Sequence, residues 1–131
     1  MDIQVLEDCD RLALEGKLSF PESVQRMAST GVERYRADLV RMEKMHYSAD
    51  GETHAVSIGL TDVPPIAEEL KSAAVKDALT AIQSGKIDYG EFLRRIMAAG
   101  VSDYGVWLRG RKAIYFGRSG DFYVENFPGQ K

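Results

Sequence analysis

The two histidines are the residues of this chain best suited to bind a metal ion or to move a proton near neutral pH. His46 and His54 flank Asp50 and Gly51, residues that favour a tight turn between two strands. A loop of two or four residues puts the two side chains on opposite faces of the hairpin, and only a loop of three or five residues places them side by side. We therefore expect two ordinary strand histidines and no bound metal or cofactor; a paired metal site is the alternative.

Two tyrosines form a second candidate. Tyr35 and Tyr104 each follow a Gly-Val pair that ends a predicted helix, and each hydroxyl could face the seam between two halves of the chain, where ligands often bind. Tyr35 could also form a polar cluster with Arg36 and Asp38. Packing of the tyrosines in the core is the interpretation we favour. These residues and the two histidines are our candidate ligand-binding residues.

Sequence signatures of catalysis are missing. The chain has no Gly-x-Ser-x-Gly elbow, no phosphate-cradling glycine loop and no His-Glu-x-x-His pair. Its single cysteine, Cys9, lies on the apolar stripe of a predicted helix and should be buried as a small apolar residue. We therefore assign no catalytic residue. An enzyme that uses scattered polar residues is the alternative.

Basic residues near the end of the chain alternate with aromatic ones, a mixture that can contact phosphates while stacking bases. The residues concerned are Arg109, Arg111, Lys112 and Arg118 among Trp107, Tyr115, Phe116 and Tyr123. Residues 1–84 carry 9 basic and 15 acidic side chains, and residues 85–131 carry 8 and 5. The net charge of −3 is far from that of a dedicated nucleic-acid binder, so we do not expect such a partner.

An internal repeat dictates the elements that position these residues. Residues 16–54 align without a gap on residues 85–123, and nine of the 39 pairs are identical, against roughly two or three expected by chance. We expect a single domain, 1–131, made of two repeats, about 1–62 and 66–131, packed about a pseudo-twofold axis.

Each repeat predicts two helices. In the first, we expect helices over 2–15 and 20–30, with a capping box formed by Ser19 and Glu22 and a stop at Gly31. In the second, an apolar stripe predicts a helix over 66–84, and Asp88 and Glu91 repeat the box before a helix that ends at Gly100.

Alternating residues after each helical pair predict three short strands. These cover about 33–39, 42–47 and 52–58 in the first repeat and 104–108, 113–116 and 122–124 in the second. The expected fold class is α+β: an internally duplicated helix-helix-three-strand unit that forms one antiparallel sheet, covered on one face by about four helices.

Composition indicates a cytoplasmic protein. The 44% hydrophobic and 28% charged content is ordinary for soluble domains, and no apolar run approaches the roughly 20 residues that span a bilayer. The first ten residues, MDIQVLEDCD, are acidic where a signal peptide needs basic residues and then an apolar run. We expect no membrane association.

The segment LSFPESVQRMASTGVERYRADLVRMEKMHYSADGETHAV, residues 18–56, resembles the YbcV-like family of uncharacterised prophage-encoded proteins, and the likeness extends over most of the chain. This family is also numbered as domain-of-unknown-function family 1398, and some members are labelled phage envelope protein. The resemblance implies a bacterial or prophage origin and a small α+β domain. It implies no activity and no residue roles.

These observations predict a non-enzymatic protein-binding or adaptor module. We expect an unidentified protein partner and a homodimer that forms through a strand edge or a helix face, because a six-strand open sheet leaves its edges unprotected. The first alternative is a small-molecule-binding or enzymatic domain with a pocket between the repeats, and the second is a weak nucleic-acid binder.

Overall fold

Four helices and six strands occur in two equivalent sets along the chain in the computed structural model, which describes residues 1–127. The first set is α1 (Ile3–Leu14), α2 (Phe20–Ser29), β1 (Val32–Asp38), β2 (Glu43–Ser48) and β3 (Thr53–Ser57). The second set is α3 (Ser72–Gln83), α4 (Tyr89–Ala98), β4 (Val101–Trp107), β5 (Lys112–Gly117) and β6 (Phe122–Asn126). Each element of the second set begins and ends 69 residues after its counterpart, which confirms the predicted repeat unit.

Three of the four helices begin at a side-chain cap, those of α2 and α4 at the predicted residues, whereas Lys71 at the start of α3 makes no such hydrogen bond. Asp2 accepts hydrogen bonds from the backbone at the start of α1, and Ser19 and Glu22 form the full capping box of α2. Asp88 caps α4 by accepting from the amide of Glu91, but the predicted box is only half formed, because the Glu91 carboxylate pairs with Arg95.

The predicted helix over 66–84 is wrong in its first turns, because α3 begins only at Ser72. The preceding segment is bound to the C-terminal end of α4: the amide of Ala67 donates to the carbonyl of Met97, and the amide of Lys71 donates to that of Ala99. These tertiary hydrogen bonds replace the helical ones that the apolar stripe indicated.

One antiparallel sheet joins the two repeats, in the order β3-β2-β1-β4-β5-β6. The central strands β1 and β4 pair with Arg36 opposite Gly105, two residues at the same repeat position. A pseudo-twofold axis therefore passes near this pair. The free edges of the sheet are β3 and β6.

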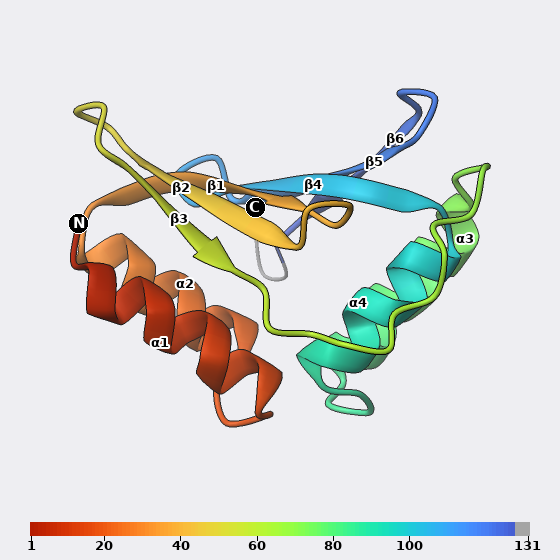
Figure 1. Ribbon diagram of the computed structural model, residues 1–131, viewed down its shortest axis with the longest axis horizontal. Helices are drawn as coiled ribbons and strands as arrows, with labels where there is room; N and C mark the ends of the chain where they lie inside the picture. Colours follow the sequence, from red (N-terminus) through yellow and green to blue (C-terminus); the bar gives the residue numbers. More distant parts are fainter. Residues whose placement is uncertain (128–131) are drawn as a thin grey trace.

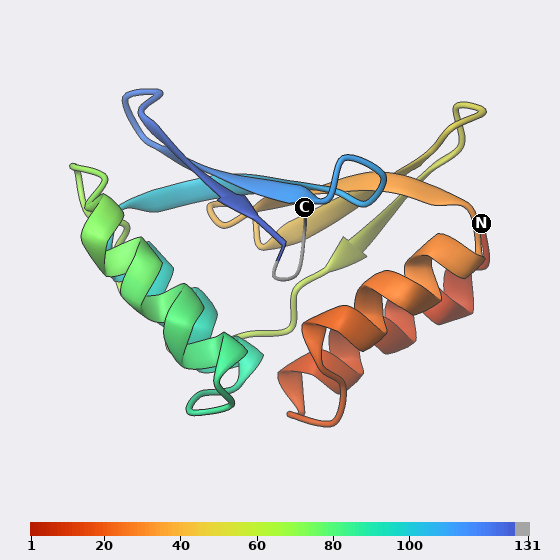
Figure 2. The same cartoon turned by 180° about the vertical axis from the view of Figure 1, so that it is seen from behind.

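All four helices lie on one side of the sheet, with α1 and α2 under the first repeat and α3 and α4 under the second (Figures 1 and 2). The tips of the β2–β3 and β5–β6 hairpins rise on the opposite side. The core lies between sheet and helices and includes Leu6, Cys9, Leu93, Ile96 and Val106. Burial raises the pKa of the Cys9 thiol, in keeping with its predicted apolar role. Within residues 1–127, no helix is long and apolar enough to cross a membrane.

Candidate functional site

Three of the predicted candidate residues lie in the core, where the repeats meet. The exposed fractions of Tyr35, His46 and Tyr104 are 4%, 2% and 2%. The rings of Tyr35 and Tyr104 pack edge to face with centroids 6.4 Å apart, and the Tyr104 hydroxyl is hydrogen-bonded to that of Tyr89. Burial raises the pKa of Tyr89 and Tyr104 well above the ordinary value. Aromatic rings therefore occupy the seam, and a ligand pocket there stays a prediction.

A buried ion pair beside these rings escaped the sequence analysis. Lys44 on β2 places its Nζ 2.9 Å from Oδ1 of Asp10 on α1, and the two side chains are 8% and 6% exposed. This approach is an ion pair that is not aligned as a hydrogen bond, since Asp10 Oδ1 has no hydrogen-bond partner among the described residues. The ammonium also lies 4.4 Å from the centroid of the Tyr89 ring.

Lys44 is charged in the folded protein. Burial alone lowers the pKa of Lys44, but its electrostatic interactions with Tyr104, Asp10 and Tyr35 outweigh this effect, so the pKa lies above its ordinary value. The repeat contained a signal for the pair, because the offset of 69 places Asp10 on Leu79 and Lys44 on Ala113. Two charged residues on core positions of the other copy indicate a charge pair in the core.

The two histidines share the inward face of the β2–β3 hairpin, contrary to the arrangement that we preferred. The Ser48 amide donates to the Glu52 carbonyl, which closes a three-residue loop and pairs His46 with His54. Burial, followed by the charge of Lys44, lowers the pKa of His46 to about 4, so its imidazole is neutral at pH 7. The described residues contain no group of three or more potential ligands placed to hold a metal ion.

His54 is separate from the buried rings. Its Nε2 lies 3.5 Å from Oε2 of Glu7 on α1 and has no hydrogen-bond partner among residues 1–127. His54 therefore belongs to the space between α1 and β3.

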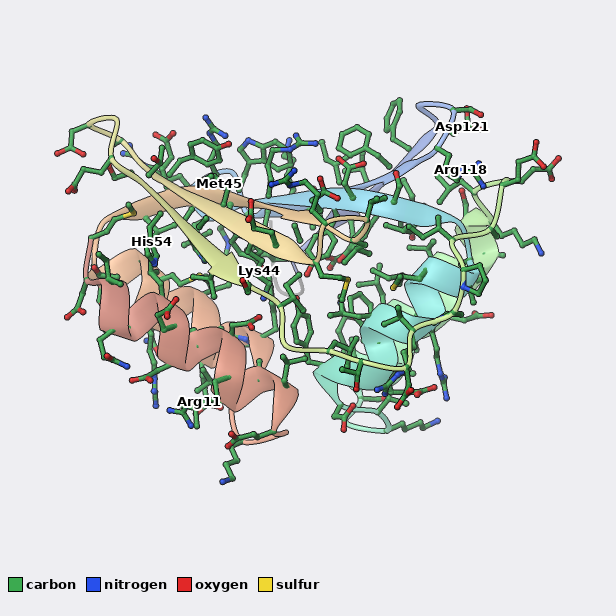
Figure 3. The ribbon with its side chains drawn as sticks, viewed as in Figure 1. Arg11, Lys44, Met45, His54, Arg118 and Asp121 are labelled. Carbon is green, nitrogen blue, oxygen red and sulfur yellow. The ribbon has the colours of Figure 1, made fainter. Side chains whose placement is uncertain are left out.

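The remaining candidates, Arg36 and Asp38, point to the side of the sheet that no described helix covers, here called the outer face. The predicted polar cluster of these residues with Tyr35 is therefore wrong, because Tyr35 points to the core on the other side of β1. Side chains of the six strands cross this face in three rows. The rows are Thr53, Tyr47, Arg34, Trp107, Lys112 and Asn126; Ala55, Met45, Arg36, Gly105, Ile114 and Val124; and Ser57, Glu43, Asp38, Asp103, Phe116 and Phe122. In Figure 3, Met45 lies on this face and Lys44, its neighbour in β2, lies on the helix side.

Arginines and aromatic rings are stacked in pairs on the outer face. The guanidinium of Arg34 lies 3.9 Å from the centroid of the Tyr47 ring. The guanidinium of Arg36 lies 5.5 Å from the centroid of the Phe116 ring and pairs with Asp103 at 2.6 Å. These contacts restrict the motion of two flexible side chains.

Large apolar side chains extend this surface. Phe122 is 62% exposed and Val124 is 41% exposed. The Trp107 ring lies over Gly105, since a β-carbon at Gly105 would be only 2.6 Å from the ring. A hollow of about 360 Å³ beside Arg36 and Asp38 ends the face.

The outer face contains part of the basic and aromatic set that raised the question of nucleic acid. Trp107, Lys112 and Phe116 point outward, whereas Tyr115 and Tyr123 point to the helix side. The charges of the face balance, with three basic and three acidic side chains in its rows. Such a surface lacks the excess positive charge that binding to phosphates requires. The alternation of inward and outward side chains along each strand was the sequence signal that could have revealed the outer face.

The fold and this surface define an internally duplicated α+β protein with one uncovered, aromatic sheet face. The chain belongs to the family described as "Protein of unknown function (DUF1398)", whose family model matches residues 53–126, more than half of the sequence. This match confirms the predicted domain family. No curated protein matches the chain.

Proposed function

We propose that this protein is a non-enzymatic protein-binding module whose partner docks on the outer face of the sheet. The observation that carries the proposal is the composition of that uncovered face. Tyrosine, tryptophan, phenylalanine, methionine and arginine are the residues enriched in protein interfaces, and Tyr47, Trp107, Phe116, Met45 and Arg36 meet there.

The shape and charge of the face favour a protein over the other classes of partner. The raised hairpin tips flank the face, so a partner surface can be held between them (Figure 1). The balanced charge argues against nucleic acid, as described above. A complementary partner would place apolar side chains over the middle row of Met45, Ile114 and Val124.

The test is the binding of one purified partner to variants of the outer face. A protein captured from bacterial extract is purified, and its affinity for the wild-type chain is measured by calorimetry. Trp107→Ala should weaken binding about thirtyfold, the effect of removing a hot-spot side chain of about 2 kcal/mol. Ile3→Ala, which removes an exposed apolar side chain from α1, is the matched control and should change nothing.

Unchanged affinity for Trp107→Ala and for Arg36→Ala would refute the proposal. Retention on nucleic acid that falls steeply with salt would favour the nucleic-acid alternative.

The predicted homodimer belongs to this proposal and is supported by the free edges of β3 and β6. Light scattering at high protein concentration tests it, and a monomer throughout would contradict it. The cytoplasmic location and the bacterial or prophage origin stay predictions.

A further inference from the structure

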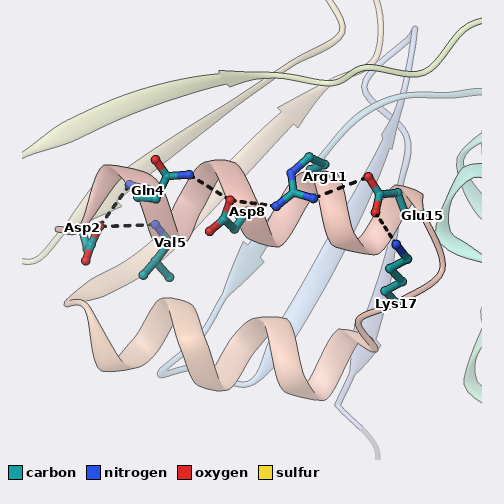
Figure 4. Close-up of polar contacts among 7 residues, drawn as sticks. All are labelled: Asp2, Gln4, Val5, Asp8, Arg11, Glu15 and Lys17. Carbon is teal, nitrogen blue, oxygen red and sulfur yellow. Dashed lines mark hydrogen bonds and ion pairs between the residues drawn. The ribbon is translucent and has the colours of Figure 1, made fainter.

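A groove separates α1 from the free edge of β3 and is distinct from the outer face. Its volume is about 920 Å³, and α1 and β3 supply its walls. Figure 3 shows Arg11 on the α1 side and His54 on the β3 side, and Figure 4 shows α1 beside this strand with its line of polar contacts from Gln4 to Lys17. The groove is long and open, as a site for an extended chain must be.

The edge of β3 along this groove has backbone groups that do not pair with β2. β3 pairs only with β2 among the described strands. Glu52 and Ile58, at the two ends of β3, form backbone hydrogen bonds with the β2 side of the hairpin. Because backbone hydrogen bonds alternate along an antiparallel pair, the backbone groups of His54 and Val56 also point to β2. The N–H and C=O groups of Thr53, Ala55 and Ser57 therefore point outward, away from β2.

The helix wall of the groove has an ordered charge pattern. Glu7 and Arg11 of α1 and Glu15 at its C-cap are four residues apart, which places their side chains on one face at intervals of about 6 Å. Arg11 is paired with Asp8 at 3.0 Å and with Glu15 at 3.6 Å. Glu7 faces only His54 and has no lysine or arginine partner among the described residues.

The second repeat has different residues at the same place. At the equivalent positions Glu7 becomes Lys76 and His54 becomes the larger Tyr123. A hydrogen bond of 3.1 Å from Gln83 to Glu125 ties α3 to β6, where the first repeat has Leu14 and Val56. The residues that line the groove are thus not dictated by the duplicated fold, since the other copy has different side chains at these positions.

We propose that this groove binds an extended peptide segment as an added strand on β3. Alternate side chains of a strand repeat at about 6.6 Å, close to the spacing of the three charges on α1. The favoured segment therefore has a basic, an acidic and a basic side chain, each two residues apart, against Glu7, Arg11 and Glu15 in turn. Backbone hydrogen bonds to β3 supply affinity, and the charges on α1 select the sequence and its register.

The probe is the acetylated, amidated peptide Ser-Thr-Lys-Val-Glu-Val-Lys-Thr-Ser. Its control is the charge-inverted Ser-Thr-Glu-Val-Lys-Val-Glu-Thr-Ser. Binding is measured by calorimetry at low salt, and backbone amide exchange is followed by NMR. We expect the first peptide to bind at least about tenfold more tightly than the second, because three charge contacts reverse sign. It should slow exchange of the amides of Thr53, Ala55 and Ser57.

Two proline variants locate the site. Ala55→Pro removes an outward N–H that β2 does not use, so the sheet should remain folded while peptide binding is lost. Val124→Pro makes the equivalent change on β6 and should leave peptide binding intact. Glu7→Gln should weaken binding about threefold, the effect of one partly exposed charge pair.

Three results would overturn the inference: no binding at millimolar peptide, equal binding of the two peptides, or full binding to folded Ala55→Pro. Protection of the β6 amides instead would also overturn it. The proposed function is tested separately, because Trp107→Ala leaves this groove untouched.

Discussion

The buried pair of Lys44 and Asp10 offers the sharpest test of how charge is accommodated in this fold. Replacing Lys44 with methionine keeps most of the volume but leaves the Asp10 carboxylate buried without its cation. Removing one partner of a buried pair costs about 3–5 kcal/mol of unfolding free energy. Domains of this size are stable by only about 5–15 kcal/mol, so the single variant should be close to unfolding.

The double variant Asp10→Leu with Lys44→Met should recover most of this loss. The second repeat has Leu79 and Ala113 at the equivalent positions, both buried, so the same backbone already accepts an apolar pair there. Apolar replacements of buried ion pairs are often neutral or stabilising, because the desolvation cost of two charges disappears with them. We expect the free energy of unfolding of the double variant to lie within about 1 kcal/mol of that of the wild type.

Urea unfolding of the wild type, Asp10→Leu, Lys44→Met and the double variant at pH 7, followed by circular dichroism, measures the coupling energy. Lys112→Met, at an exposed position on β5, is the matched control and should change the free energy of unfolding by less than about 0.5 kcal/mol. A loss of under about 1 kcal/mol for Lys44→Met would refute the reasoning. So would a double variant as unstable as the single one.

Three further predictions follow from the core and the turns. His46 has a pKa of about 4 when folded and about 6.5 when unfolded, so the unfolded chain binds the proton first as the pH falls. The free energy of unfolding should therefore fall by about 3 kcal/mol from pH 7 to pH 4. Urea unfolding of His46→Phe at the same pH values should lack this part of the decrease. Gly100→Ala should cost several times more than the about 1 kcal/mol of Gly31→Ala in thermal unfolding. Both glycines have positive φ, but only at Gly100 would a β-carbon meet backbone, 2.2 Å from the Glu69 carbonyl oxygen; equal losses would contradict this. Ser19→Ala should cost about 1 kcal/mol by removing the α2 cap, and an unchanged urea midpoint would exclude that role.

Much of the fold could be predicted from the sequence because local signals occur twice. Ser19 and Asp88 cap equivalent helices, and Gly31 and Gly100 end them. Each signal is weak alone, but their agreement at one offset leaves few alternative arrangements. The start of α3 could not be predicted in this way, because the residues before it are held by backbone bonds to α4.

The candidate residues were harder to predict, because their roles depend on register and burial. One residue in the hairpin loop decides whether His46 and His54 share a face, and Asp50 and Gly51 fit loops of more than one length. Lysine is usually a surface residue, and Lys44 is buried only because its position in β2 faces the helix side of the sheet. The residues of the outer face come from both repeats and are far apart in the sequence, and only the pairing of β1 with β4 brings them together.

The differences between the two repeats separate the residues that build the fold from those that do not. Both copies fold to the same arrangement, so a residue that appears in only one copy is not required for it. The first copy alone places Asp10 and Lys44 in the core and His54 beside Glu7, where the second copy has Leu79, Ala113, Tyr123 and Lys76. Buried charge costs stability without shaping this sheet. The requirements of the fold therefore do not explain these residues on the α1 and β3 side of the first repeat, where we propose the peptide groove.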